Sequence, residues 1–188
     1  MKQHVHIVYV AVALIVGIAI GFSVTPEYAQ MKSEKQSPMM SIGRADKYVD
    51  LRFIDGMIAH HQAAIYLAQQ AKEHSKRSDI QALASTIIAV DTEGIEKLYT
   101  LKKTWFGNTK KISQFTKVQL GSADDQFDLR FINALEAHHE EAIDVAKEMQ
   151  TKSTRSEVLT LAGDVIAGLS AGIKTLTEWR GDWYGINK

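Results

Sequence analysis

Two pairs of adjacent histidines are the residues best suited to chemistry in this sequence. His60 and His61 form the first pair, and His138 and His139 form the second. Neutral imidazole binds copper, zinc, iron and nickel, whereas magnesium and calcium prefer oxygen ligands. Buried histidines can also donate hydrogen bonds to helix carbonyls or to carboxylates. Because the pair occurs twice, we weigh a metal or another ligand equally against a purely structural role.

The two pairs belong to an internal duplication with an offset of 78 residues. Residues 50–54 read DLRFI and recur at residues 128–132, and the same offset places Trp105 on Trp183. The alignment runs without a gap over about 58 residues, of which about 23 are identical. Such a match over this length indicates a tandem repeat of one structural unit.

Each copy has the pattern of two amphipathic helices. Apolar residues and one histidine of each pair recur at steps of three and four, the spacing of a helix face that packs on a core. The face of the first helix contains Phe53, Met57, His60, Ala64, Leu67 and Ala71, and that of its counterpart contains Phe131, Leu135, His138, Ala142, Val145 and Met149. Short polar turns near residues 75–78 and 153–156 make the helices of each copy antiparallel. The prediction is an all-α protein, a four-helix bundle built from two tandem hairpins.

Smaller local patterns give further expectations for this bundle. Ser78 with Gln81, and Thr154 with Glu157, have the spacing of a capping box where the second helix of each hairpin should begin. Asp50 and Arg52 are expected to form a charge pair at a helix start. The connection over residues 106–122 could cross one end of the bundle or run its whole length.

An uncharged apolar stretch, residues 7–24, precedes the repeats. About 18 residues come close to the length that a helix needs to cross a bilayer. The exit from this stretch lacks a convincing small-residue cleavage pattern, which favours an N-terminal transmembrane anchor over a cleaved signal peptide. The rest of the chain is then periplasmic or otherwise extracytoplasmic. The expected order is an anchor (1–24), a linker (25–45), a first repeat (46–107), a connector (108–123) and a second repeat (124–188).

Composition narrows the function classes. The formal net charge is +0, which argues against nucleic acid as a partner because phosphate binding requires a basic surface. The absence of cysteine excludes disulfides, thiolate metal sites and cysteine nucleophiles. No nucleophile motif such as G-x-S-x-G is present either, and we therefore expect a protein that is not an enzyme.

The first histidine pair lies in the segment FIDGMIAHHQAAIYLA, which resembles the signature of the family called domain of unknown function 305. Asp55, Met57, His60 and His61 match that signature. The resemblance covers about residues 45–107 and, more weakly, 124–185. It implies a ferritin-like helical bundle, secreted or membrane-anchored, with a role in copper binding in some members.

The second copy departs from this signature. Met57 becomes Leu135, Asp55 becomes Asn133, and Asp91 becomes Leu169. Soft thioether ligands, which suit Cu(I), are therefore fewer than the resemblance implies. The candidate metal ligands are Asp55, Met57, His60, His61, Asp91, His138 and His139, with the first copy better equipped. Glu136 and His139 have a Glu-x-x-His spacing, but Ile58 stands at the position equivalent to Glu136, so the carboxylate set of a di-iron site is incomplete.

Two functional hypotheses follow. In the first, a membrane-anchored extracytoplasmic bundle sequesters or hands on a metal, with copper as the expected ion. In the second, a metal-free bundle is a structural or accessory subunit of a larger membrane protein complex, and its histidines only pack.

Overall fold

The computed structural model describes residues 40 and 42–186, and within these residues it contains four α-helices and no strand. The helices are α3 (Val49–His74), α4 (Ser78–Phe106), α5 (Phe127–Lys152) and α6 (Ser156–Tyr184). Each boundary in the second pair lies 78 residues after its counterpart in the first pair. The predicted all-α bundle of two equivalent hairpins is therefore confirmed.

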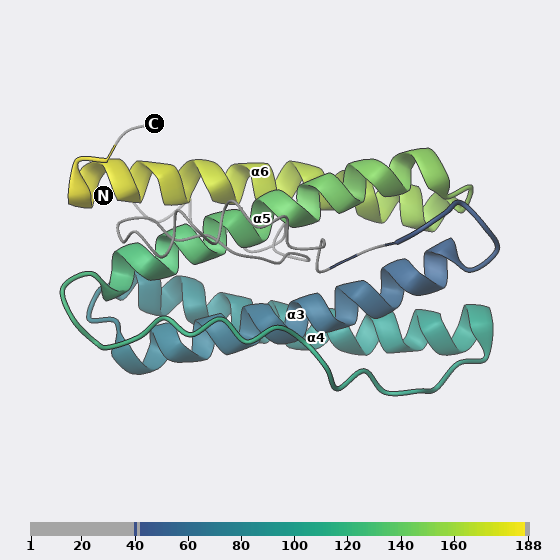
Figure 1. The fold of residues 1–188 in the computed structure, drawn as a ribbon, viewed down its shortest axis with the longest axis horizontal. Helices are drawn as coiled ribbons and strands as arrows, with labels where there is room; N and C mark the ends of the chain where they lie inside the picture. The colour runs from purple at the N-terminus through teal and green to yellow at the C-terminus, as the bar shows by residue number, and fades with distance from the viewer. Residues whose placement is uncertain (1–39, 41, 187–188) are drawn as a thin grey trace, which may run out of the picture.

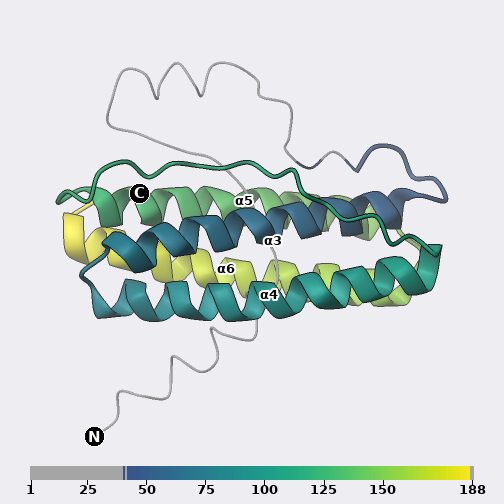
Figure 2. The ribbon, with the colours of Figure 1, turned by 90° about the horizontal axis from the view of Figure 1, so that it is seen from below.

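The two hairpins lie side by side along their length (Figures 1 and 2). In each, a three-residue turn reverses the chain, and the serine that begins the turn accepts a hydrogen bond from the arginine two residues later. This bond is 3.2 Å long at Ser75 and Arg77, and 3.1 Å at Ser153 and Arg155. Helix α3 packs closely on α4, α5 packs closely on α6, and the first helices of the two hairpins, α3 and α5, meet in the middle.

The capping boxes expected at the second helix of each hairpin do not form. Helices α4 and α6 begin at Ser78 and Ser156, and neither N-cap residue makes a side-chain hydrogen bond. The Gln81 amide instead donates to the carbonyls of Lys72 and Ser75, at 3.0 and 2.7 Å. Gln81 therefore satisfies the open C-terminal end of α3, where helix carbonyls lack partners.

The connection between the hairpins follows α3 along the bundle (Figure 1). The Gln62 amide donates to the carbonyl of Ile112, and the Gln70 amide donates to that of Val118, both at 2.9 Å. A long connection of this kind lets α5 start beside the C-terminal end of α3, where the rings of His74 and Phe127 are 5.3 Å apart. The resulting order, with one long crossover between two hairpins, is the ferritin-like one.

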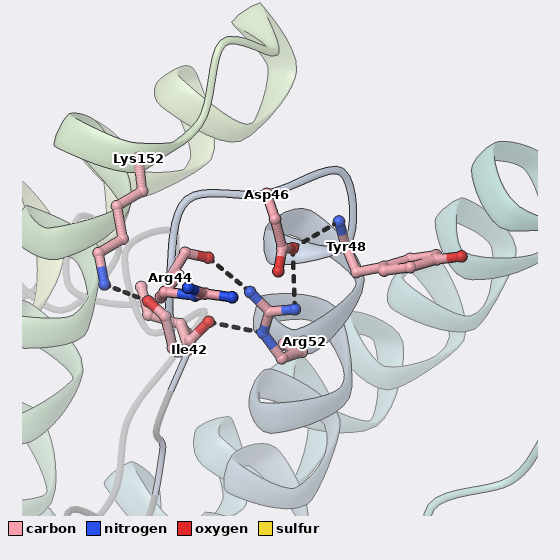
Figure 3. Close-up of polar contacts among 7 residues, drawn as sticks. Ile42, Arg44, Asp46, Tyr48, Arg52 and Lys152 are labelled. Carbon is pink, nitrogen blue, oxygen red and sulfur yellow. Dashed lines mark hydrogen bonds and ion pairs between the residues drawn. The ribbon is translucent and has the colours of Figure 1, made fainter.

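A segment ahead of each hairpin is also duplicated. The guanidinium of Arg52 donates to the carbonyls of Ile42 and Arg44, each at 2.6 Å (Figure 3). Arg130 makes the same two bonds, at the same distances, to the carbonyls of Leu120 and Ser122. We call residues 42–48 the strap, because they cross the start of α3 and are tied to it by Arg52.

The ends of the two hairpins are joined reciprocally. Arg155 lies 3.2 Å from Asp50 and 4.2 Å from the centre of the Trp105 ring. Its equivalent, Arg77, lies 3.5 Å from Asp128 and 4.2 Å from the Trp183 ring. Asp50 therefore pairs with the other hairpin, and the expected charge pair between Asp50 and Arg52 is wrong.

The predicted anchor, residues 7–24, lies outside the residues that the structure describes. Among the described helices one, α6, is long and apolar enough to cross a membrane. Of its most apolar 18-residue stretch, 33% is buried inside the protein. Helix α6 packs along α5 and contributes Val165, Leu169 and Leu176 to the hydrophobic core. Packing within the bundle thus accounts for apolar residues on this helix.

Candidate metal centre

All four histidines of the duplicated pairs lie inside the bundle. His60 and His61, on α3, have no exposed surface, and His138 and His139, on α5, are 1% and 2% exposed. The residues that flank them on each predicted face, including Phe53, Met57, Leu67 and Met149, are buried as well. The 3.6-residue periodicity of the sequence therefore placed both pairs in the interior correctly.

One histidine of each pair meets its counterpart between α3 and α5. The rings of His60 and His138 stack with their centroids 4.8 Å apart and their planes 18° from parallel. The His139 ring lies 5.9 Å from that of His138. Helices α3 and α5 thus bring at least three imidazoles, one from the first copy and two from the second, to a single place, which we call the histidine seam.

The ring nitrogens of this cluster lack hydrogen-bond partners. Both nitrogens of His60 and His138 are buried and have no protein partner, and the same holds for Nε2 of His61 and Nδ1 of His139. An unpaired buried polar group costs about 1–3 kcal/mol, and nearly all such groups in folded proteins have a partner. Six buried nitrogens without a protein partner in one core are more than packing alone accounts for, and imidazole nitrogens of this kind suit a metal.

His61 has a nearby acid on α4. Its Nδ1 lies 2.9 Å from Oδ1 of Asp91, which is 3% exposed. The two groups are close enough for an ion pair, although their alignment does not give a hydrogen bond. Burial raises the pKa of Asp91, and the His61 imidazole opposes that rise. The other ring nitrogen, Nε2, would be 3.0 Å from a Cβ on Gly94, so this glycine makes room for the imidazole.

The second copy has the same space without the acid. A Cβ on Gly172 of α6 would lie 2.9 Å from both Cδ2 and Nε2 of His139. The position equivalent to Asp91 is Leu169, which is fully buried. Gly94 and Gly172 therefore hold equivalent places against the two outer histidines, while only the first copy offers a carboxylate.

Burial keeps the imidazoles of His60, His138 and His139 neutral. It lowers the pKa of His60 and of His138 well below the usual 6.5, and lowers that of His139 to about 3. Neighbouring histidines add to the effect on His60 and His138. A charged imidazole is disfavoured in a low-dielectric interior, and the neutral form that prevails is the one able to bind a metal.

The other candidate ligands divide into two groups. Met57 is fully buried one helical turn before His60 and His61 on α3, which puts its thioether on the same side of the helix. Asp55 instead contacts Lys102, with Oδ1 and Nζ 2.6 Å apart. The Lys102 side chain is fully buried and also donates to the carbonyl of Lys110.

The second copy has an equivalent buried charge pair that the sequence analysis missed. Arg180, which takes the place of Lys102, forms an ion pair with Glu136, and both side chains are 6% exposed. Arg180 also donates to the amide oxygen of Asn133, the residue equivalent to Asp55. The Glu136 carboxylate is thus neutralised by an arginine, as it would not be in a di-iron site. The signal in the sequence for these two buried ion pairs is a basic residue, Lys102 or Arg180, at the matching position of an apolar helix face in each copy.

The histidine seam is not a finished coordination site as it stands. Within residues 40 and 42–186 no three His, Asp or Glu side chains are grouped so that they could hold an ion. The lone pair of an imidazole nitrogen lies in the ring plane, so stacked rings do not aim at a common point. An ion shared by His60 and His138 requires at least one ring to rotate, with a thioether completing the set.

Comparison with known proteins identifies a family and several solved structures to which this chain is similar. The family described as "Domain of unknown function (DUF305)" matches residues 50–126 and again 128–188. Among solved structures, CopM in the apo form is 31% identical, with a TM-score of 0.64, covering 72% of this chain and 98% of that one. CopM in the Cu(I)-bound form and in the Ag-bound form are each 30% identical over the same shares, also with a TM-score of 0.64. Comparison with curated proteins gives no match. This chain belongs to the DUF305 family.

Proposed function

We propose that this protein binds copper, as Cu(I), at the histidine seam and sequesters it or hands it on without catalysing a reaction. The observation that carries the proposal is the group of buried imidazoles, six of whose ring nitrogens have no protein partner. Binding an ion would satisfy these nitrogens and recover part of the cost of burying them. His60 on α3 stacks on His138 on α5, so rotation of either ring would let nitrogens from both hairpins bind one ion.

The chemistry of the donors favours copper. Imidazole nitrogen binds copper, and thioether sulfur is the soft donor that selects Cu(I), whereas the nearby carboxylate of Asp55 pairs with Lys102. The related CopM structures include Cu(I)-bound, Cu(II)-bound and Ag-bound forms. Ag(I) resembles Cu(I) in its preference for soft ligands, so it is a suitable probe for this chain.

The proposed ligands are His60 and His138, with Met57 as the thioether. His61 and His139 are further nitrogen donors, and the Asp91 carboxylate lies against Nδ1 of His61. The seam is contributed by both copies, which favours one shared site over a site confined to the first hairpin. The first copy still supplies more of the donors, because Leu135 and Leu169 replace Met57 and Asp91 in the second.

We further propose that residues 7–24 anchor the bundle in a membrane, with the bundle on the extracytoplasmic side. The support is the length of this uncharged stretch and its poor cleavage site. Amino-terminal sequencing of the protein purified from its native membrane tests the anchor. A mature chain that begins near residue 24–30 would show that the stretch is a cleaved signal.

Copper binding is tested on the full-length protein by competition for Cu(I) with a chromophoric chelator. We expect His60→Ala and His138→Ala to weaken binding by about 10–100-fold each. His74→Ala is the matched control, since His74 contacts Phe127 at the end of α3 and belongs to neither pair. Loss with His60→Ala alone would confine the site to the first hairpin. If neither substitution changes Cu(I) binding, the histidines are structural and the accessory-subunit hypothesis replaces this one.

A further inference from the structure

Met40 lies ahead of α3, yet its side chain enters the bundle. It is 5% exposed, and its Sδ is 2.9 Å from the place where a Cβ would stand on Gly56. The sulfur therefore occupies a hollow that exists because residue 56 has no side chain. The backbone N–H of Met40 donates to the Glu141 carboxylate on α5, at 3.2 Å. Met40 thus contacts both helices that form the histidine seam.

This contact lies about one helical turn from the stacked imidazoles. Gly56 precedes His60 by four residues on α3, and residues so spaced have their Cβ positions about 5–6 Å apart. Helical side chains lean toward the N-terminus of their helix, so the His60 ring leans toward Gly56. On α5, Glu141 follows His138 by three residues. Because α5 runs antiparallel to α3, both contacts of Met40 lie on the same side of the histidine pair.

The second copy shows what this position looks like without a thioether. At the 78-residue offset Met40 becomes Val118, Gly56 becomes Ala134, and Met57 becomes Leu135. Ala134 is 1% exposed, so a methyl group fills the hollow that the sulfur occupies in the first copy. The methionine, the glycine that admits it and the neighbouring methionine therefore occur together in one copy and are replaced together in the other.

The chain from Ile42 onward, two residues after Met40, is held by hydrogen bonds. Figure 3 shows Arg52 bound to the carbonyls of Ile42 and Arg44. Lys152 of α5 donates to the carbonyl of Gly43. Ile42 is also 1% exposed. The strap thus joins the start of α3 to the end of α5 and holds the backbone two residues after Met40, while the Met40 thioether keeps the rotational freedom of an unbranched side chain.

We propose that Met40 is a second thioether ligand of the ion bound at the histidine seam, delivered by the strap from outside the repeated hairpin. This inference rests on the proposed function. Two thioethers, Met40 and Met57, then approach the seam from the same side as the His60 ring. Rotation about one or two side-chain torsions of Met40 would move its sulfur along the seam. The Met40 sulfur could therefore follow the His60 ring, which must itself rotate to bind an ion.

The test compares Met40→Leu with the full-length protein in Cu(I) competition and in X-ray absorption at the copper edge. We expect affinity to fall by about tenfold or more and one sulfur scatterer to disappear from the copper shell. Leucine has nearly the volume of methionine, so the metal-free melting temperature should change little. Met149→Leu is the matched control, because Met149 is fully buried on α5 but lies eleven residues beyond His138.

A second variant displaces the sulfur without removing it. Gly56→Ala places a methyl group 2.9 Å from the present position of Sδ, and the thioether has to move away. We expect the same loss of affinity and of the sulfur signal as for Met40→Leu, with no further loss in the double variant. Unchanged affinity and sulfur count in both variants, with His60→Ala still weakening binding, would overturn the role of Met40 and leave the proposed function standing. Absence of Cu(I) binding by the unmodified protein would overturn both.

Discussion

The space that Gly172 leaves for His139 gives a quantitative prediction about the core around the seam. The substitution is Gly172→Ala on α6, where the added Cβ would stand 2.9 Å from two atoms of the imidazole. Gly163 on the same helix is the control, because a Cβ there meets no atom within 4 Å. Both positions lie in α6, and the substitution at each is glycine to alanine.

The expected magnitudes follow from two opposing effects. Replacing glycine by alanine in a helix interior stabilises it by about 1 kcal/mol. Gly163→Ala should show this gain in full. At residue 172 the His139 ring, which is 2% exposed, has to shift within a packed core. Overpacking of this kind costs about 1–3 kcal/mol. Gly172→Ala should therefore range from no gain to a loss of about 2 kcal/mol.

Thermal unfolding of the metal-free protein, followed by circular dichroism, measures the difference. For a protein of this size 1 kcal/mol corresponds to roughly 2–4 °C, so Gly172→Ala should melt roughly 2–12 °C below Gly163→Ala. Copper affinity should fall only in Gly172→Ala if His139 is a donor. If Gly172→Ala raises the melting temperature as much as Gly163→Ala, His139 does not occupy the place described here, and the tight packing of the seam is refuted.

Two further predictions concern the metal-free fold. Burial lowers the pKa of His60, His138 and His139 in the folded state, so below pH about 6.5 the unfolded chain binds more protons. The free energy of unfolding in urea should then decrease as pH falls from 6.5, by up to about 1.4 kcal/mol per pH unit for each histidine. A constant free energy of unfolding between pH 7 and 5 would contradict the burial of these histidines. Lys102→Met leaves the Asp55 carboxylate without its cation and should cost about 1–3 kcal/mol in the same assay. Much of that loss should return in Lys102→Met combined with Asp55→Asn, and no loss in the single variant would show that the ion pair is not formed.

Much of the fold could be predicted because its signals are local and occur twice. Steps of three and four on each helix face identified the residues that are buried, and the gapless offset made the second hairpin a copy of the first. The crossover could not be traced, because its route depends on the side chains of Gln62 and Gln70 on a helix distant in sequence. Gln81 was misjudged for a related reason, since it caps the preceding helix instead of its own.

The candidate site was predictable in part. The paired histidines, and the glycines that face them, stand out in the repeat. Their ring stacking, however, depends on how α3 and α5 cross, which neither copy specifies alone. Asp55 matches the family signature, but its carboxylate contacts Lys102, 47 residues further along the chain. The sequence gives no local signal of that contact. The sequence places Met40 in the linker and gives no sign of its contact with Gly56, because that contact requires the strap to fold back over the start of α3.

The most direct test of the account is an anomalous diffraction map of crystals of this protein loaded with Cu(I), collected at the copper absorption edge. If Cu(I) binds at the histidine seam, we expect a peak between α3 and α5 within bonding distance of His60 and His138. One or both of these imidazoles should then be turned away from the stacked arrangement. A single peak at another place, with His60 and His138 still stacked and unpaired, would contradict it.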